Sequence, residues 1–183
     1  MRIEQTPLLD CFIVHEKVHE DARGFFIETF NQRVFNAASG LDILFVQDNQ
    51  SRSSKGVLRG LHMQRGASGQ AKLVRVLEGS VLDIAVDLRK NSPSFGQHFS
   101  IELTADNHKQ FFVPAGFAHG FVVLSNAATF FYKVDKFYEP GNEVGIIYND
   151  KDLNIDWKLT DSEIILSEKD KTLGSFADYA AFL

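Results

Sequence analysis

The sequence predicts a mainly β fold, either a sandwich or a barrel. Short apolar runs follow one another from residue 44 to residue 134, and turn-like groups rich in Gly, Ser and Asn separate them. Many short strands at nearly regular spacing are typical of these architectures. The 17 Phe residues indicate the same class, because aromatic side chains fit a pleated, half-buried surface. Since no linker or low-complexity stretch divides the chain, we expect one domain over residues 1–183.

The N-terminal residues are expected to form a strand, a turn and a second strand. Residues 1–16 read as the first strand, with an apolar stretch at residues 11–14. Pro7 keeps the residues before it out of a central position in a sheet. Residues 21–24, Asp-Ala-Arg-Gly, read as a turn, and residues 25–30 read as the next strand.

A short helix is expected over residues 32–38, where apolar residues recur at helical spacing and Gly40 follows as a stop signal. Residues 167–171, Ser-Glu-Lys-Asp-Lys, form a candidate capped helical turn whose charges by default belong to a solvated surface. The other expected strands are residues 44–47, 57–61, 73–77, 81–88, 99–103, 111–113, 120–124 and 130–134.

The overall charge and the single cysteine narrow the class of protein. The net charge of −5 and the pI near 5.6 argue against broad nucleic-acid binding but allow a local basic pocket for one anionic ligand. Cys11 alone cannot form an intramolecular disulfide, and no Cys/His zinc spacing occurs. No N-terminal leader pattern and no run of about 18 apolar residues is present. The sequence therefore predicts a soluble, cytoplasmic protein without a membrane partner.

Candidate site residues gather in two spacings within the β-rich part. Residues 47–89 carry Arg59, His62 and Lys72 on apolar-rich segments separated by glycines, a pattern typical of polar side chains at the mouth of a β-barrel. Residues 114–119 read Pro-Ala-Gly-Phe-Ala-His. Together the two spacings resemble the paired motifs of the cupin superfamily, G…HxH…E…G and PxGxxH.

The resemblance to metal-binding cupins fails at two ligand positions. The second histidine of HxH is Gln64 here, and Lys72 stands at the glutamate position. An ammonium repels a divalent cation, and most catalytic sites need three good protein ligands, of which only His62 and His119 remain. We therefore expect no metal, although a metal-dependent cupin stays an alternative. A cation-lined barrel suits the stabilisation of negative charge on a substrate oxygen.

Seven segments of the sequence carry a closer resemblance. In their order along the chain, and without large gaps, they resemble the dTDP-4-dehydrorhamnose 3,5-epimerase family. A set of seven ordered motifs is more specific than a single catalytic pair. The segments are DARGFFIETF (21–30), QDNQSRSSKGVLRGLHMQ (47–64), KLVRVLEGSVLDIAVDLR (72–89), SPSFGQ (92–97), VPAGFAHGFVVLS (113–125), YKVDKFYEPGNEVGI (132–146) and LSEKD (166–170).

The resemblance implies both a fold and a reaction. The fold is a double-stranded β-helix, the cupin-type jelly roll, with short peripheral helices. The reaction is the 3,5-epimerisation of dTDP-4-dehydro-6-deoxy-D-glucose to dTDP-4-dehydro-L-rhamnose in dTDP-L-rhamnose biosynthesis. Epimerisation beside a 4-keto group removes a C–H proton to give an enolate and returns a proton to the opposite face. It needs a base, a group that holds the oxyanion and an acid, and no cofactor.

Four residues match the catalytic positions of the family. His62 corresponds to the base, a role that suits an imidazole titrating near neutral pH, and Asp170 corresponds to the carboxylate that orients it. Lys72 corresponds to the group that holds the substrate's 4-oxygen. Tyr132 corresponds to the acid on the opposite face. Taken alone, His62 would read as a satisfied core histidine and Tyr132 as a packed aromatic residue.

Further matched positions suit a sugar nucleotide. Arg23 and Arg59 would meet the diphosphate or neighbouring hydroxyls, because a guanidinium offers forked donors to phosphate oxygens. Tyr138 corresponds to the ring that stacks on thymine. By themselves Glu28 and Lys169 would read as solvated side chains, and for Lys169 both interpretations stay open. The other positions that match nucleotide or sugar contacts are Glu28, Gln47, Asp48, Asn49, Lys72, His119, Glu143 and Lys169.

The chain departs from the family pattern at three places. Residues 65–69 replace a proline-containing loop, residues 148–151 replace Trp-Asn-Asp-Pro, and Met63 replaces an aromatic residue. The glycines of the first segment predict a more mobile loop beside the site. None of the three removes a catalytic match, but they leave open a 3- or 5-monoepimerase for another dTDP-deoxysugar. A non-catalytic sugar-nucleotide binder is a further alternative.

The resemblance also implies a homodimer. In the family an N-terminal strand crosses to the partner, so Arg23 and Glu28 are expected to serve the neighbouring pocket. The apolar strand at residues 11–14 would be an unprotected sheet edge in a monomer, which favours the same assembly. The expected partners are thus a dTDP-sugar and a second copy of the chain, with no nucleic acid.

Overall fold

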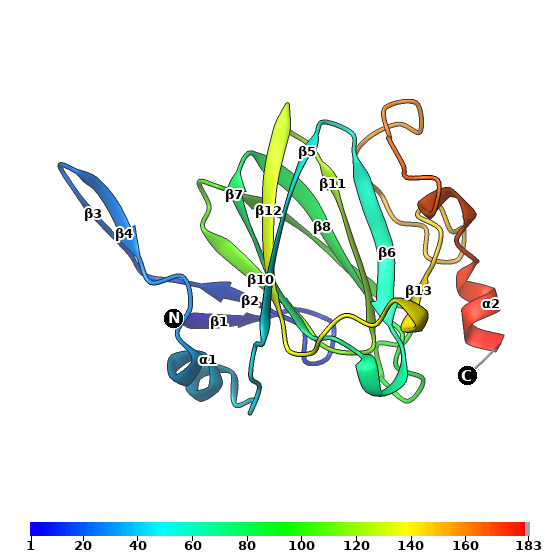
Figure 1. The fold of residues 1–183 in the computed structure, drawn as a ribbon, viewed down its shortest axis with the longest axis horizontal. Helices are drawn as coiled ribbons and strands as arrows, with labels where there is room; N and C mark the ends of the chain where they lie inside the picture. Colours follow the sequence, from blue (N-terminus) through cyan, green and yellow to red (C-terminus); the bar gives the residue numbers. More distant parts are fainter. Residues whose placement is uncertain (182–183) are drawn as a thin grey trace.

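The computed structural model describes residues 1–181 as two facing β-sheets with short helices at the periphery (Figure 1). The strands are β1 (Arg2–Gln5), β2 (Phe12–His15), β3 (Val18–Asp21), β4 (Gly24–Ile27), β5 (Gln47–Ser54), β6 (Leu58–Gln64), β7 (Lys72–Glu78), β8 (Ser80–Asp87), β9 (His98–Thr104), β10 (Lys109–Val113), β11 (Phe117–Val123), β12 (Ala127–Val134) and β13 (Glu143–Gly145). The helices are α1 (Gln32–Ser39), α2 (Phe176–Ala181) and the 3-10 helices η1 (Gly66–Ser68), η2 (Pro140–Asn142) and η3 (Asp170–Thr172).

The two sheets form a jelly roll. The six-stranded sheet has the order β1-β2-β10-β7-β12-β5, the five-stranded sheet has the order β13-β6-β11-β8-β9, and β3 pairs with β4 alone. The predicted fold class, a mainly β cupin-type double-stranded β-helix with short peripheral helices, is confirmed. None of the helices within the described residues has the length and the apolar run that a bilayer-spanning helix needs.

The main hydrophobic core fills the space between the sheets. Alternate residues of β12, namely Ala128, Phe130 and Tyr132, point into this space, as a pleated strand requires. Phe121 of β11 stacks on Phe130 with ring centroids 4.1 Å apart, so the two rings join the sheets. Burying one such side chain stabilises the fold by roughly 1.5–3 kcal/mol.

A second core lies on the outer face of the five-stranded sheet. Leu82 and Ile84 of β8 point outward and pack in a cluster with Leu153 and Trp157 of the C-terminal segment. β8 is therefore buried on both faces, which explains why its sequence is apolar almost without interruption. The C-terminal segment is held against the barrel and carries η3 to its mouth.

The N-terminal residues form two paired strands where the sequence predicted one. β1 and β2 pair antiparallel on either side of a turn that contains Pro7, and β2 pairs on its other side with β10. The strand at residues 11–14 is therefore not a sheet edge, and the argument for a dimer from that edge is wrong. The more polar β1 takes the edge position, where its side chains are mostly exposed.

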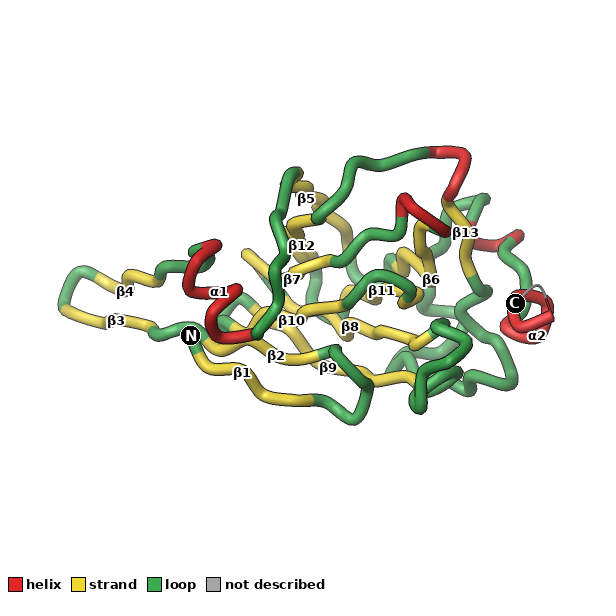
Figure 2. Tube along the Cα trace, turned by 90° about the horizontal axis from the view of Figure 1, so that it is seen from below, coloured by secondary structure: helices red, strands yellow, loops and turns green. Residues whose placement is uncertain are grey.

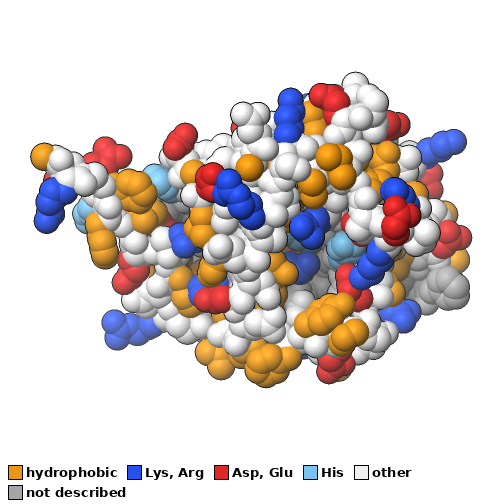
Figure 3. All heavy atoms as spheres, turned by 45° about the horizontal axis from the view of Figure 1, so that its top comes forward, with side chains coloured by type: hydrophobic (Ala, Val, Ile, Leu, Met, Phe, Trp, Pro, Cys, Tyr) orange, Lys and Arg blue, Asp and Glu red, His pale blue; other side chains and the backbone are white. Residues whose placement is uncertain are grey.

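β3 and β4 form a hairpin that projects beyond the barrel (Figures 1 and 2). The predicted turn at residues 21–24 is its tip, but the strand predicted over residues 25–30 ends at Ile27. Phe25 and Phe26 are 59% and 70% exposed, and hydrophobic side chains are visible on the projecting arm in Figure 3. The chain itself leaves this apolar surface uncovered.

The predicted helix over residues 32–38 is confirmed as α1, one residue longer. Asn31 caps its start, because its Oδ1 accepts a hydrogen bond from the Val34 N–H at 3.3 Å. Gly40 ends it at φ 73°, a left-handed conformation that glycine adopts without a Cβ penalty. Phe35 is the buried anchor, in contact with Phe112 of β10.

The observed strands differ from the expected ones at their boundaries, and two of these differences bear on the site. The strand expected at residues 44–47 is instead the polar β5, Gln47–Ser54, which lies at a sheet edge and pairs only with β12. Its side chains need no apolar alternation, because one side faces the cavity described below and the other faces outward. β11 begins at Phe117 rather than at residue 120, so His119 lies within a strand.

The turn predicted at residues 167–171 is confirmed as a cap followed by η3. Ser167 Oγ accepts a hydrogen bond from the Asp170 N–H at 3.1 Å. The default interpretation of its charges as a solvated surface is wrong for Asp170, which is 3% exposed. The capping serine thus fixes the point at which an acidic side chain turns inward.

Residues 65–69, predicted as a mobile loop, form a hydrogen-bonded turn that contains η1. Ser68 Oγ donates to Glu139 Oε2 at 2.6 Å and accepts from Asn142 Nδ2 at 2.8 Å. Gln64 ties the preceding strand to the same segment, because its amide donates to the Glu139 carbonyl and accepts from the Glu139 N–H. These contacts hold the turn against η2 despite its glycines.

Candidate active site

A cavity of about 500 Å³ opens between the two sheets. Residues of β5, β7 and β12 line it from the six-stranded sheet, and residues of β6 and β11 line it from the five-stranded sheet. Basic and histidine side chains gather around a hollow on this face of the molecule (Figure 3). The residues predicted from the sequence that line it are Arg59, His62, Lys72, His119, Tyr132, Lys169 and Asp170.

Glycines allow the strands that carry the two histidines to approach closely. A Cβ on Gly60 of β6 would lie 2.6 Å from the Gly120 Cα of β11, so neither strand tolerates a side chain there without a shift. The register then sets His62 directly opposite His119, next to a register shift at which β6 has one residue more than β11. Directly paired residues point to the same side of a sheet, so both imidazoles face the cavity.

His62 and Asp170 form a hydrogen-bonded pair across 108 positions of sequence. The His62 Nε2 lies 2.6 Å from the Asp170 Oδ1. An ionised carboxylate only accepts, so Nε2 carries the proton and Nδ1 keeps a free lone pair. Burial lowers the pKa of His62 below its usual 6.5, against the charge and hydrogen bond of Asp170, which raise it. Near pH 7 the imidazole is therefore neutral and able to accept a proton.

Lys72 brings a cation to the cavity from β7. Burial lowers the pKa of its ammonium from 10.5 to about 8, against the charges of Asp83 and Glu143, which raise it. Within residues 1–181 its Nζ takes part in no hydrogen bond or ion pair. At neutral pH Lys72 therefore offers a charged group whose three N–H donors are open to a ligand oxygen.

Tyr132 enters the cavity from β12, in the sheet opposite to that of His62. Burial raises the pKa of the Tyr132 phenol above its usual 10, against the charge of Arg59, which lowers it. The phenol therefore keeps its proton at neutral pH. Arg59, on β6, is held by Ser53 Oγ, which accepts from its Nε and Nη2 at 3.2 and 3.3 Å. The imidazole and the phenol thus reach the cavity from different walls.

A charged cluster lies at the mouth of the cavity. Glu143 Oε2 accepts from the Tyr138 hydroxyl at 2.5 Å and from Lys169 Nζ at 2.7 Å, and its Oε1 lies 3.9 Å from His62 Nδ1. Burial would raise the pKa of Glu143, but the hydrogen bonds from Lys169 and Tyr138 lower it below 4.5. Tyr138 is 49% exposed, so its ring is open to a ligand at the rim.

The structure does not bring every predicted residue to this cavity. Arg23 is at the tip of the projecting hairpin, with its side chain 90% exposed and paired with Asp21. Glu28 follows the hairpin and contacts Asn31. The Asp48 carboxylate accepts from Lys133 Nζ at 2.8 Å on the outer face of the six-stranded sheet.

Two further predicted residues lie at the edge of the cavity rather than in its lining. Asn49 is paired with Tyr132 in register and therefore shares its side of the sheet. The Gln47 amide donates to the Asn49 Oδ1 at 2.8 Å, which places both side chains together on β5. They lie next to the lining residues Gln50 and Ser51 of the same strand.

The sequence reasoning missed several polar groups of the site. Gln50, Ser51 and Ser167 line the cavity, and the polar composition of residues 47–54 was the signal for an edge strand there. Asp83 was also missed, although it is a carboxylate in the middle of the buried run of β8. Its Oδ1 accepts from His119 Nε2 at 2.9 Å, and no part of Asp83 is exposed.

The side chains around the cavity do not form a metal-binding group. Gln64, at the second histidine position of the cupin motif, is 5% exposed and uses its amide to hold the Glu139 backbone. Within residues 1–181, no three His, Cys, Asp or Glu side chains are grouped so that they could hold a metal ion.

Comparison with known proteins identifies the family. A sequence model described as dTDP-4-dehydrorhamnose 3,5-epimerase matches residues 5–178. The epimerase of that name from Shigella flexneri is 48% identical over 183 residues, which cover 100% of both chains. The crystal structure of the Elizabethkingia anophelis epimerase has a TM-score of 0.94 and 54% identity over 97% of each chain.

A Legionella pneumophila structure adds a ligand to the comparison. That protein, a dTDP-6-deoxy-D-glucose-3,5-epimerase in complex with dTDP-4-keto-L-rhamnose, has a TM-score of 0.92 and 44% identity, and the match covers 97% of this chain and 96% of that one. The resemblance seen in seven ordered segments thus extends over nearly the whole chain and its fold. The chain belongs to the dTDP-4-dehydrorhamnose 3,5-epimerase family.

Proposed function

We propose that the chain catalyses the cofactor-independent 3,5-epimerisation of dTDP-4-dehydro-6-deoxy-D-glucose to dTDP-4-dehydro-L-rhamnose, a step of dTDP-L-rhamnose biosynthesis. One observation carries the proposal: an imidazole paired with a buried carboxylate, an unpaired ammonium and a phenol meet in one cavity between two sheets. Proton exchange beside a ketone needs these three kinds of group. The family and the sugar nucleotide bound to the Legionella protein support this substrate.

His62 is proposed as the base. Its Nδ1 takes the proton from C5 or C3, the C–H electron pair moves into the bond to C4, and the C4 oxygen becomes the enolate oxygen. Asp170 holds the ring through Nε2 and stabilises the imidazolium that forms. Lys72 is proposed to donate to the enolate oxygen, because a fixed cation stabilises the negative charge that develops there.

Tyr132 is proposed as the acid. Because it enters from the sheet opposite to that of His62, it can return a proton to the other face of the carbon, which inverts the configuration. The nearby charge of Arg59, which lowers the pKa of Tyr132, stabilises the phenolate that remains. Solvent then reprotonates Tyr132 and takes the proton from His62 before the second carbon reacts.

The mouth of the cavity is proposed to bind the nucleotide. Arg59, Lys169 and His119 supply donors for the diphosphate and sugar oxygens, and the exposed ring of Tyr138 stacks on the base. Glu143 holds Tyr138 and Lys169 in place. Gln47 and Asn49 would contribute from the edge strand, whereas Asp48 lies on the outer face and makes no contact here.

Proton NMR of the keto-sugar nucleotide in heavy water tests the proposal. Solvent deuterium is expected at both C3 and C5, with no loss of rate after dialysis against a chelator. Uptake at only one carbon would instead identify a monoepimerase for another deoxysugar. Binding of the dTDP-sugar without uptake at either carbon would contradict the proposal and identify a non-catalytic binder.

The pH dependence of kcat/KM is expected to be bell-shaped. His62 must be neutral to accept a proton, and its pKa lies below 6.5, so activity falls as the pH decreases through that lowered value. Lys72 must be charged, and its pKa is about 8, so activity falls as the pH rises through about 8. Initial rates from pH 5 to 10 check this, and a rate that keeps rising beyond pH 9 would contradict the role of Lys72.

We also propose that the protein works as a homodimer in which the hairpin of β3 and β4 reaches the partner. The exposed Phe25 and Phe26 provide an apolar surface that the chain leaves uncovered, and Arg23 and Glu28 lie outside their own cavity. This arrangement would bring Arg23 and Glu28 to the neighbouring site.

Replacing Phe26 with aspartate is expected to weaken the dimer by about 2 kcal/mol or more, because a charge would stand in the centre of a desolvated contact. Sedimentation velocity measures the dissociation constant. Leu9→Asp, at an exposed apolar residue of the turn between β1 and β2 (48% exposed, against 70% for Phe26), is the control. A wild-type chain that sediments as a monomer at micromolar concentration would refute the dimer.

The cytoplasmic location and the single domain stay predictions. Cell fractionation tests the location, and limited proteolysis tests the single domain.

A further inference from the structure

Asp83 is a buried carboxylate that the proposed mechanism does not use. It lies on the inward face of β8 between Val81 and Ala85, and all three residues are 0% exposed. Its Oδ1 accepts from His119 Nε2, but its Oδ2 has no hydrogen-bond partner among the described residues. Leaving a buried carboxylate oxygen unpaired is costly unless another charge compensates it.

The compensating charge is the ammonium of Lys72. Asp83 is the strongest of the charges that raise the pKa of Lys72. The charged and titratable groups that line the cavity with Lys72 are Arg59 and His62 of β6, His119 of β11, Tyr132 of β12, and Lys169 and Asp170 at η3, and the carboxylates that act on Lys72 are Asp83 of β8 and Glu143 of β13. Of these, Asp83 and Glu143 raise the pKa of Lys72, and Glu143 is already engaged by Tyr138 and Lys169.

Asp83 and Lys72 are not in direct contact, and this has a chemical consequence. Lys72 forms no hydrogen bond or ion pair within the described part of the chain, so Asp83 acts on it through space. A direct ion pair would occupy the N–H donors that the substrate oxygen needs. A carboxylate that acts through space without direct contact favours the charged form of Lys72 and leaves its donors free.

We propose that Asp83 is a positioning residue whose carboxylate keeps Lys72 protonated under the substrate's 4-oxygen. The inference rests on the role proposed above for Lys72. The same carboxylate fixes the tautomer of His119: with the Nε2–H donated to Asp83, the Nδ1 is the nitrogen left to accept from a ligand. Asp83 thus sets the charge of Lys72 and the tautomer of His119, although it does not line the cavity itself.

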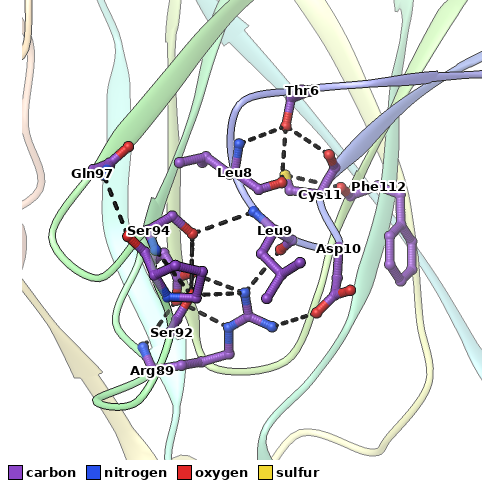
Figure 4. Close-up of polar contacts among 12 residues, drawn as sticks. Thr6, Leu8, Leu9, Asp10, Cys11, Arg89, Ser92, Ser94, Gln97 and Phe112 are labelled. Atoms are coloured by element: carbon purple, nitrogen blue, oxygen red, sulfur yellow. Dashed lines mark hydrogen bonds and ion pairs between the residues drawn. The ribbon is translucent and has the colours of Figure 1, made fainter.

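Asp87, four residues further along β8, provides a matched control. It is also 0% exposed, but its oxygens accept from Arg89 Nη2 at 2.8 Å, Ser92 Oγ at 2.5 Å and Ser94 Oγ at 2.6 Å. Figure 4 shows Arg89, Ser92 and Ser94 together at the loop that follows β8, next to Leu9 and Asp10 of the N-terminal turn. Asp87 is therefore a structural carboxylate whose hydrogen bonds are satisfied outside the cavity.

Asp83→Asn tests the proposal, because asparagine keeps an acceptor for His119 and removes only the charge. The fall of kcat/KM at high pH is expected to move down by about one pH unit, with a loss of about fivefold at pH 8, about tenfold at pH 9 and little loss at pH 6.5. Asp87→Asn is expected to lower the thermal midpoint and to leave the pH profile as in the wild type. A loss in Asp83→Asn that is equal at every pH, or no loss, would overturn the proposal.

NMR titration of the protein without substrate gives a readout that does not depend on catalysis. In lysine-labelled protein, the Lys72 Cε signal, assigned by its absence in Lys72→Met, is expected to titrate near pH 8 in the wild type and at lower pH in Asp83→Asn. The proposal also requires that the carboxyl-carbon signal of Asp83 in the wild type is that of an ionised group from pH 6 to 9. A protonated Asp83 in this range would contradict the proposal, and this measurement needs no folded variant. If the wild type shows no deuterium uptake, the epimerase function fails while these titrations still decide the role of Asp83.

Discussion

Replacing His62 with asparagine is expected to reduce deuterium uptake at both C3 and C5 by about 10²–10⁴-fold, the usual contribution of a general base. Asparagine has a similar size and can still donate to Asp170, but it has no nitrogen that accepts a proton near pH 7. Both carbons are affected because His62 is the proposed base for each of them. Single-turnover NMR in heavy water measures the two carbons separately.

The chain offers a matched control for this variant. His15 also pairs with a carboxylate, its Nε2 lying 2.8 Å from Glu4 Oε2, but the pair is on the sheet edge formed by β1 and β2. His15→Asn should leave uptake unchanged. Asp170→Asn should reduce uptake less than His62→Asn, since it disturbs the orientation of the base but keeps the base itself. Uptake in His62→Asn above a tenth of the wild-type rate would contradict the assignment.

The sequence predicted those parts of the site that a short motif or an apolar pattern encodes. His62 directly follows the expected strand 57–61 and Lys72 directly precedes the expected strand 73–77, which correspond to β6 and β7. The pairing of His62 with Asp170 depended on the family resemblance, because only the fold brings together residues 108 positions apart. The helix α1 was predicted well, since its apolar spacing and Gly40 are local signals.

The parts that sequence reasoning missed are set by tertiary context. β5 has no apolar alternation, because an edge strand with one side on a polar cavity is not buried on that side. Asp83 reads as an interruption of an apolar run until the register between β8 and β11 places it beside His119. The pairing of β1 with β2 was missed because the short polar β1 has no hydrophobic pattern of its own.

Replacing Tyr132 with phenylalanine is expected to separate proton exchange from inversion. The base, its carboxylate and Lys72 remain, so the enolate still forms and His62 can return a solvent-derived deuteron to the face from which it took the proton. The opposite face has lost its donor, because Tyr132 is the phenol that reaches the cavity from β12. The inverted product should fall by about 10²–10⁴-fold, whereas deuterium should still enter the unconverted substrate.

This ratio of exchange to inversion distinguishes a lost acid from a damaged cavity, because a distorted site would slow both processes together. Tyr148→Phe is the control: it removes a phenol whose hydroxyl donates to Asp161 Oδ1 at 3.1 Å in the C-terminal segment, and both rates should stay as in the wild type. If Tyr132→Phe lowered exchange and inversion by the same factor, the phenol would act in binding or in enolate formation. The proposed mechanism would then be wrong, because it requires that the proton leaves toward His62 on one sheet and that a proton returns from Tyr132 on the other.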